Sequence, residues 1–165
     1  MCLSYFRKKI LGKNEGQAFG FNANENPCDR KEILEAVNFS INSALLLIGW
    51  LPGKAKDLQG KNILEIDPGQ NLGLPAILIG LGAKVLVVDP YLVEWVKAWH
   101  DLFYQLLSEV SRGKFPEINL TPFTQMINLG EHTADGLFLF KETLDVIDLV
   151  AGSIDISYSN ATLEY

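Results

Sequence analysis

The residues best suited to chemistry lie between Lys61 and Pro90. An acid, Glu65, stands in a short apolar run, and that run leads into a glycine-bearing turn, residues 67–73. Glycine lets the backbone of such a turn approach a ligand closely, because no Cβ intervenes. A second acid, Asp89, closes the next apolar run, where a carboxylate can accept hydrogen bonds from both hydroxyls of a ribose. The stretch therefore indicates a site for a ribose-bearing ligand.

Three apolar segments position these residues, namely 63–66, 74–81 and 84–88. Short β-branched runs on either side of a helix-length segment predict strand, helix and strand, the unit of a parallel sheet. Both strands are apolar at nearly every position, which is typical of strands covered on both faces. We therefore expect an α/β fold, a Rossmann-like open and mainly parallel sheet with helices on both faces. Ligands of such sheets bind at the carboxyl ends of the strands, where the turn and Asp89 fall.

Two long helices and two further strands are predicted around this unit. The first helix begins at Asp29, which can cap it, and its apolar face comprises Ile33, Val37, Ile41, Leu45 and Ile48. The second follows an apolar stripe from Leu92 to Val110. Strands are expected at 137–140 and 154–158, while 142–150 is compatible with a short helix or a loop. Together they make one domain, 29–165, behind an irregular N-terminal arm, 1–28.

Composition narrows the functional classes. The chain has 165 residues, a net charge of −6 and a pI of about 4.9, which argue against a nucleic-acid or anionic-membrane surface. Its two cysteines, Cys2 and Cys28, lie outside the strand–helix–strand unit, so a reduced, cytoplasmic protein is the simpler expectation. With only two histidines, His100 and His132, we expect no metal site.

Each candidate residue also has a structural interpretation. Glu65 could be a buried carboxylate bonded to helix amides, Asp89 could cap the following helix, and Asn160 could be an ordinary turn residue. A dinucleotide site is a second functional alternative, but it requires G-x-G-x-x-G. Here Gly69 and Gly73 are separated by three residues, and Asp67 occupies the place of an early glycine. The spacing therefore disfavours an oxidoreductase module, although Asp89 would serve either site.

Three motifs in order resemble those of the class I S-adenosylmethionine-dependent methyltransferases. The first is Leu64-Glu65-Ile66-Asp67-Pro68-Gly69-Gln70-Asn71-Leu72-Gly73, the second is Val87-Val88-Asp89-Pro90-Tyr91, and the third runs from Ser153 through Asn160 to Tyr165. The resemblance implies S-adenosyl-L-methionine as cofactor and methyl transfer to an acceptor that it does not identify. It assigns the cofactor to Glu65, Asp67, Gly69, Asn71, Gly73, Asp89, Pro90 and Asn160, and it names no catalytic residue.

Within this resemblance, each contact matches one part of the cofactor. Glu65 would hold the ammonium, directly or through water, and Asp89 would hold the ribose hydroxyls. The loop amides would hold the methionine carboxylate and the ribose edge. Either Glu142 or Asp145 would read the adenine amino group.

The chain also departs from the family. Asp67 and Asn71 replace loop glycines, although Asp and Asn tolerate left-handed backbone better than other residues. The family's sheet continues past the fourth strand, so we expect a truncated or degenerate member whose fourth strand is an exposed edge, open to self-association or to a partner. A non-catalytic fragment that folds only with a partner is the third alternative.

Overall fold

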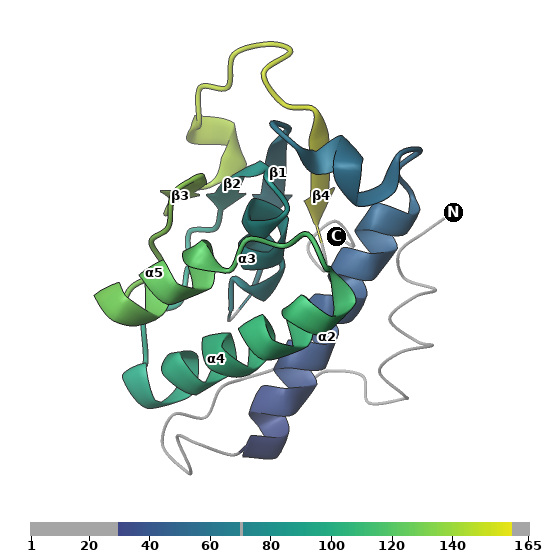
Figure 1. Ribbon diagram of the computed structural model, residues 1–165. Coiled ribbons are helices and arrows are strands. Elements are labelled where there is room, and N and C mark those ends of the chain that lie inside the picture. The colour runs from purple at the N-terminus through teal and green to yellow at the C-terminus, as the bar shows by residue number, and fades with distance from the viewer. Residues whose placement is uncertain (1–29, 70, 160–165) are drawn as a thin grey trace, which may run out of the picture.

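A computed structural model describes residues 30–69 and 71–159, which form a sheet of four parallel strands (Figure 1). The strands are β1 (Asn62–Ile66), β2 (Lys84–Val88), β3 (Leu137–Phe140) and β4 (Ile156–Ser159). Their spatial order is β3-β2-β1-β4, so β1 and β2 are central and β4 is an edge. The predicted Rossmann-like α/β fold is confirmed at this level.

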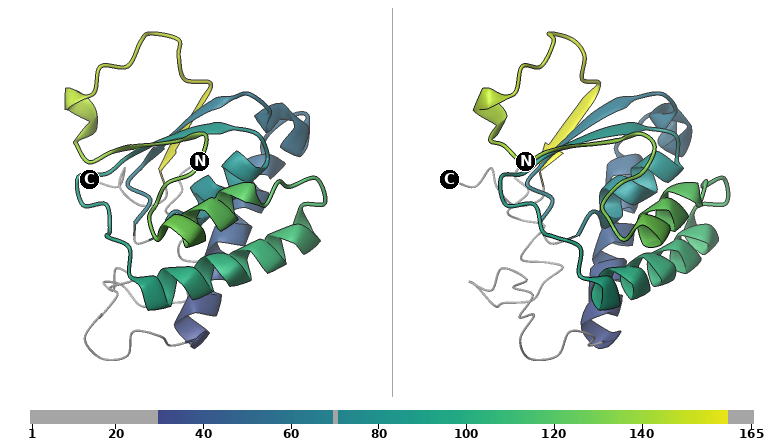
Figure 2. Two further views of the ribbon diagram at one scale, coloured as in Figure 1. Left: turned by 60° about the vertical axis from the view of Figure 1, so that its left-hand side comes forward. Right: turned by 90° about the vertical axis from the view of Figure 1, so that its left-hand side faces the viewer.

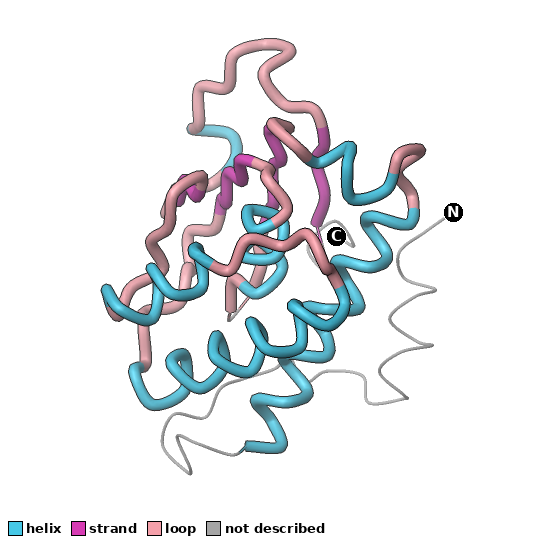
Figure 3. The backbone as a smooth tube through the Cα atoms, in the orientation of Figure 1, coloured by secondary structure: helices cyan, strands magenta, loops and turns pink. Residues whose placement is uncertain are grey.

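Among the described residues, four α-helices and two short 3-10 helices accompany the sheet (Figure 3). The α-helices are α2 (Arg30–Gly49), α3 (Gly73–Gly80), α4 (Lys97–Lys114) and α5 (Thr121–Leu129), and the 3-10 helices are η1 (Lys54–Leu58) and η2 (Leu144–Val146). By length and composition alone α2 could cross a membrane, a test that buried helices of soluble proteins also pass. Here its buried face, with Ile33, Val37 and Ile41, packs against α3 and α4.

All four described α-helices lie on one face of the sheet, as the two turned views make plain (Figure 2). The connections β1-α3-β2 and β2-α4-α5-β3 run in the same direction across the sheet, and right-handed crossovers of one direction fall on one face. The return from β3 to β4 runs the other way, and it carries only η2. The prediction of helices on both faces is therefore not met within the described residues.

Alternate residues of each strand face these two environments. Ile63, Glu65 and Val85 lie on the helix-covered face and are buried. On the other face Phe138 is 48% exposed, and Leu86 is only partly covered. We call this second face the open face. The β3–β4 crossover, residues 141–155, bounds a hollow of about 450 Å³ there, between Leu86 and Phe140 of the sheet and its own apolar residues.

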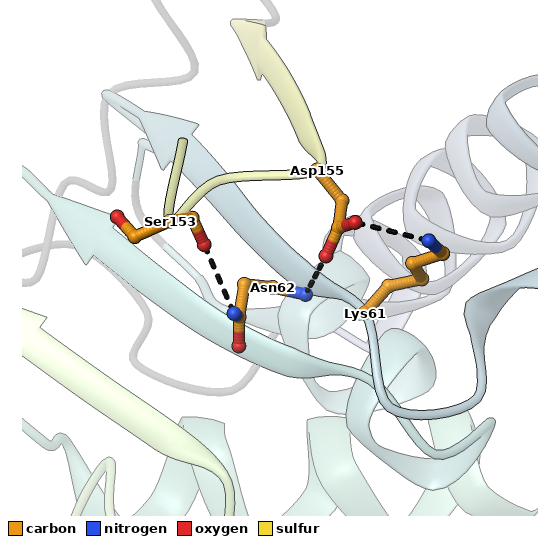
Figure 4. Close-up of polar contacts among 4 residues, drawn as sticks. All are labelled: Lys61, Asn62, Ser153 and Asp155. Carbon is orange, nitrogen blue, oxygen red and sulfur yellow. Dashed lines mark hydrogen bonds and ion pairs between the residues drawn. The ribbon is translucent and has the colours of Figure 1, made fainter. Parts of the chain in front are cut away.

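Polar contacts at the amino ends of β1 and β4 fix these two strands side by side (Figure 4). The Asp155 carboxylate accepts hydrogen bonds from the Asn62 backbone N–H and from Lys61 Nζ, both at 2.9 Å. Asn62 Nδ2 donates to the Ser153 carbonyl at 2.9 Å. This end of the sheet is opposite the carboxyl ends where the site was predicted.

Several expected boundaries differ from the structure. The second long helix begins at Lys97 rather than near Leu92, because Asp89 and Pro90 open a turn and Val96 is still extended. Helix α5 was not predicted, and Leu45, placed on the buried face of α2, is 42% exposed. The strand expected at 154–158 is confirmed as β4, two residues later. The arm, 1–28, and the Asp29 cap lie outside the described residues.

Candidate functional site

Asp67 and Asp89, both predicted site residues, lie at one edge of the sheet. Strands β1 and β2 pair in register with Ile66 opposite Val88, so the residues that follow them start together. The Asp67 N–H donates to the Val88 carbonyl at 3.0 Å, and the Asp89 N–H donates to the Phe140 carbonyl at 3.0 Å. The carboxyl ends of three strands therefore bring the turn and Asp89 together, as the parallel topology predicted.

The turn after β1 depends on left-handed backbone. Asp67 has φ +50° and Gly69 has φ +85°. Asp67 therefore adopts left-handed backbone, which Asp tolerates better than most residues. No described atom lies within 4 Å of the place where a Gly69 Cβ would stand, so the backbone there borders open space. A ligand can approach the turn at Gly69.

Asn71 and Gly73 have structural tasks at the start of α3. Asn71 Oδ1 accepts hydrogen bonds from the Gly73 N–H at 3.0 Å and from Ser40 Oγ at 3.3 Å. A Cβ on Gly73 would lie 2.8 Å from Phe103 Cζ and would collide with Ser40. Both residues therefore pack the turn against α2 and α4.

Asp89 closes a turn of its own. Its Oδ1 accepts from the Tyr91 N–H at 2.7 Å, and its side chain is buried. Burial raises the pKa of this carboxyl, the Tyr91 hydrogen bond lowers it, and the nearby Asp67 charge raises it. The alternative that Asp89 caps the following helix is wrong, because α4 begins only at Lys97. Pro90 follows it, partly exposed.

Glu65 points to the helix-covered face, one residue before the edge, and is 1% exposed. Burial is the largest influence and raises the pKa of its carboxyl to about 8, while the Tyr158 hydroxyl lowers it and the Asp89 charge raises it. Glu65 Oε2 has no hydrogen-bond partner of acceptable geometry among the described residues. The structural alternative, a carboxylate bonded to helix amides, is therefore not what the structure contains at this oxygen.

Two tyrosines near Glu65 were missed by sequence reasoning. Tyr158 stands directly opposite Glu65 in the register of β4 and β1, and its hydroxyl is also buried without a hydrogen-bond partner in the described part of the chain. Burial raises the pKa of Tyr104, on α4, a backbone hydrogen bond at Leu72 lowers it, and the nearby Glu65 charge raises it. Alternation in 154–158 placed Tyr158 on a face, but only the register between distant strands reveals its neighbour.

Tyr104 continues into a buried aromatic cluster. Its hydroxyl lies 3.3 Å from His132 Nδ1, and its ring stacks on Trp95 with 5.4 Å between centroids. Burial first, and then the charges of His100 and Lys141, lower the pKa of His132 to about 3. A histidine that stays neutral in an aromatic cluster indicates that His132 has a packing role.

Three predicted residues remain, two of them on the β3–β4 crossover. Glu142 and Asp145 are exposed on the β3–β4 crossover, and Asn160 lies outside the described residues. In comparisons with known proteins, no family model, no curated protein and no solved structure matches this chain. The interpretation of the site therefore depends on its own geometry and chemistry.

Proposed function

We propose that this chain binds S-adenosyl-L-methionine and forms the cofactor-binding part of a class I methyltransferase. The main support is the juxtaposition of the left-handed turn at Asp67 and Gly69 with Asp89, at the carboxyl ends of adjacent parallel strands. The order β3-β2-β1-β4 agrees with the first four strands of the Rossmann arrangement, whose ligands bind at that edge.

The charge of the edge favours this cofactor over a dinucleotide. Asp67 and Asp89 are close enough for one carboxylate to raise the pKa of the other, and Glu65 lies behind them. The carboxylates of Asp67 and Asp89 would repel a pyrophosphate, whereas S-adenosylmethionine carries a sulfonium and an ammonium. The oxidoreductase alternative therefore loses support from electrostatics as well as from the glycine spacing.

Each proposed contact with the cofactor follows from how accessible the protein group is to a ligand. The amides of the turn border open space at Gly69 and suit the methionine carboxylate. Asp89 Oδ2 does not take part in the Tyr91 bond and suits the ribose hydroxyls. Glu65 is buried beneath the turn, so water would relay its contact with the ammonium. Methyl transfer needs alignment of nucleophile, methyl and sulfur, and it needs a base only when the acceptor is protonated.

Thermal unfolding with S-adenosylmethionine, S-adenosylhomocysteine and NAD in parallel tests the proposal. A ligand at a hundred times its dissociation constant should stabilise the fold by about 2.7 kcal/mol. We expect both adenosyl sulfur ligands, and not NAD, to raise the melting temperature. Asp89→Asn keeps an acceptor for the Tyr91 N–H and removes the charge, so its shift should be smaller. A shift with NAD alone would favour the oxidoreductase alternative, and a cooperative melt that no ligand shifts would overturn the binding proposal.

Asp67→Gly tests the departure from the family pattern. Glycine adopts φ +50° freely and removes a carboxylate beside the methionyl part of the cofactor. We expect tighter binding of S-adenosylhomocysteine than in the parent chain, measured by calorimetry. An unchanged dissociation constant would mean that the Asp67 side chain does not obstruct the site.

Strand β4 is an edge of the described sheet, beside β1, and edge strands are common places for another strand to pair. We propose this edge as the place of self-association or of a partner strand. Sedimentation at increasing concentration tests it, and a monomer at every concentration would exclude self-association.

A further inference from the structure

Two buried oxygens that make no well-formed hydrogen bond lie on neighbouring strands, close to the turn after β1. Glu65 of β1 and Tyr158 of β4 are register partners, so their side chains project from the same face. Burial raises the pKa of the Glu65 carboxyl, and the Tyr158 hydroxyl, as a hydrogen-bonding neighbour, lowers it. Yet neither Glu65 Oε2 nor the Tyr158 hydroxyl, both buried, makes a hydrogen bond of acceptable geometry to a described residue. Each residue is the last but one of its strand, so the pair lies directly below the turn after β1.

Such a pair requires an explanation, because more than about 90% of buried polar groups in proteins have a hydrogen-bond partner. The groups that act on Glu65 come from three directions: Tyr158 from β4, Tyr104 from α4, and Asp89 beyond β2. None of them carries a positive charge. A cation above Glu65 and Tyr158, or a water that contacts a cation, would give these oxygens a hydrogen-bond partner.

We propose that Tyr158 is a positioning residue for Glu65, and that its hydroxyl donates a hydrogen bond to the Glu65 carboxylate when the ammonium of a bound ligand lies above it. This inference rests on the proposed function and adds to it a residue and a ligand group. The ligand class is an adenosyl sulfur compound that retains its amino-acid part. Binding releases the Glu65 proton to solvent, since a carboxylate and not a carboxylic acid pairs with an ammonium.

The ligand-free structure distinguishes this role from a packing role. The Tyr158 hydroxyl makes no hydrogen bond of acceptable geometry in the free protein, so Tyr158→Phe should leave the melting temperature of the free protein nearly unchanged. A hydroxyl that held the fold together would lower that temperature when removed. Tyr104→Phe is the matched control. The buried Tyr104 hydroxyl lies 3.3 Å from His132 Nδ1, so its removal should lower the melting temperature of the free protein.

Two ligands that differ in the amino-acid ammonium measure what this group contributes to binding. S-adenosylhomocysteine carries the amino-acid ammonium, and 5′-methylthioadenosine lacks it. A hydrogen bond to a charged group contributes about 1.5–3 kcal/mol, so Tyr158→Phe should weaken S-adenosylhomocysteine binding by about tenfold or more and leave 5′-methylthioadenosine binding within about twofold. Tyr104→Phe should change both affinities by the same factor.

Calorimetry of the parent chain and the two variants with both ligands decides the question. If the parent chain binds neither ligand, the proposed function fails and this inference fails with it. If the parent chain binds both ligands and Tyr158→Phe weakens both equally, or lowers the melting temperature of the free protein as Tyr104→Phe does, only the role of Tyr158 is overturned. Selective loss of S-adenosylhomocysteine binding with an unchanged free-protein melt is the expected result.

Discussion

The two faces of the sheet differ although the same strands form both. On the helix-covered face Ile63 and Val85 are 0% exposed, and α2, α3 and α4 supply the covering residues. On the open face Phe138 is 48% exposed, and Val150 of the crossover is 76% exposed. The apolar runs of β1 and β2 predicted burial on both sides, and on the open face Leu64 and Val88 are only 5% and 1% exposed, so the exposed residues there belong to β3 and to the crossover. The β3–β4 crossover contributes one 3-10 helix of 3 residues.

This difference predicts where the folding free energy is concentrated. A buried aliphatic side chain contributes through the area that it removes from water and through close packing. The helix-covered face has both. The open face has a hollow of about 450 Å³ lined by Leu86, Phe140 and residues of the crossover. We therefore expect equivalent truncations on the two faces to have unequal costs.

The largest expected effect is that of Ile63→Ala. The side chain is 0% exposed at the centre of the helix-covered face, so truncation should lower the free energy of unfolding by about 2–5 kcal/mol. Phe138→Ala, on the open face, removes a larger but half-exposed side chain and should cost about 1 kcal/mol. Urea unfolding of both variants measures the ratio. Equal costs would mean that the open face is covered in solution.

Gly73→Ala should have the next largest effect. Its Cβ would stand 2.8 Å from Phe103 Cζ and would collide with Ser40, so α3 must move away from α2 and α4. Overpacking of this kind costs about 1–3 kcal/mol. Gly49→Ala is the matched control, because no described atom lies within 4 Å of its Cβ position and its φ is not positive. That variant should be neutral or slightly more stable, and a tolerated Gly73→Ala would show that the turn yields easily.

The strand–helix–strand unit was predictable because its signals are local. Two β-branched runs on either side of a glycine-flanked apolar segment give β1, α3 and β2 nearly at their true bounds. Helix α5 also had local signals that were not weighed: Pro122 in its first turn and Gly130, with φ +65°, at its end. Its buried side comprises Pro122, Phe123 and Met126, but nine residues are a short window in which to detect helical spacing.

The positions of candidate-site residues were predictable only where the parallel topology alone determines them. Parallel strands bring Asp67 and Asp89 to one edge whatever the register. The pairing of Glu65 with Tyr158 depends on the register of two strands far apart in the sequence, and no local pattern encodes that. The position of α4 shows the same limit, since the apolar Leu92 is buried without being helical.

The pH dependence of stability probes the helix-covered face without removing volume. The pKa of Glu65 is raised from 4.5 to about 8, so the folded state binds a proton that the unfolded state has lost between these values. Its contribution is fully present below pH 4.5 and is lost as pH rises through 8, with a slope of at most about 1.4 kcal/mol per pH unit. His132, whose pKa falls from 6.5 to about 3, acts in the opposite direction below pH 6.5.

The window between pH 6.5 and 8 therefore reports on Glu65 rather than on His132. There the parent chain should lose stability as pH rises, and Glu65→Gln, which cannot ionise, should be nearly flat. Urea unfolding at several pH values compares the two slopes. Parallel slopes would mean that Glu65 is accessible to solvent and ionises as an ordinary carboxyl, which would also weaken the case for a site beneath the turn.

The smallest expected effect concerns the attachment of the crossover to β1. The backbone bond from Asn62 and then the contact with Lys61 lower the pKa of Asp155, so its contribution is present at neutral pH and is lost as pH falls below the ordinary value of 3.8. Asp155→Asn retains an acceptor for the Asn62 N–H and loses the ion pair, which is exposed and therefore weak. Asp155→Ala loses both. At pH 7 we expect a small fall in melting temperature for Asp155→Asn and a larger fall for Asp155→Ala. The alanine variant also loses the hydrogen bond from the Asn62 N–H, which sets the register of β4 on β1. Equal losses in the two variants would assign the effect to charge, and high salt would then abolish it in the parent chain.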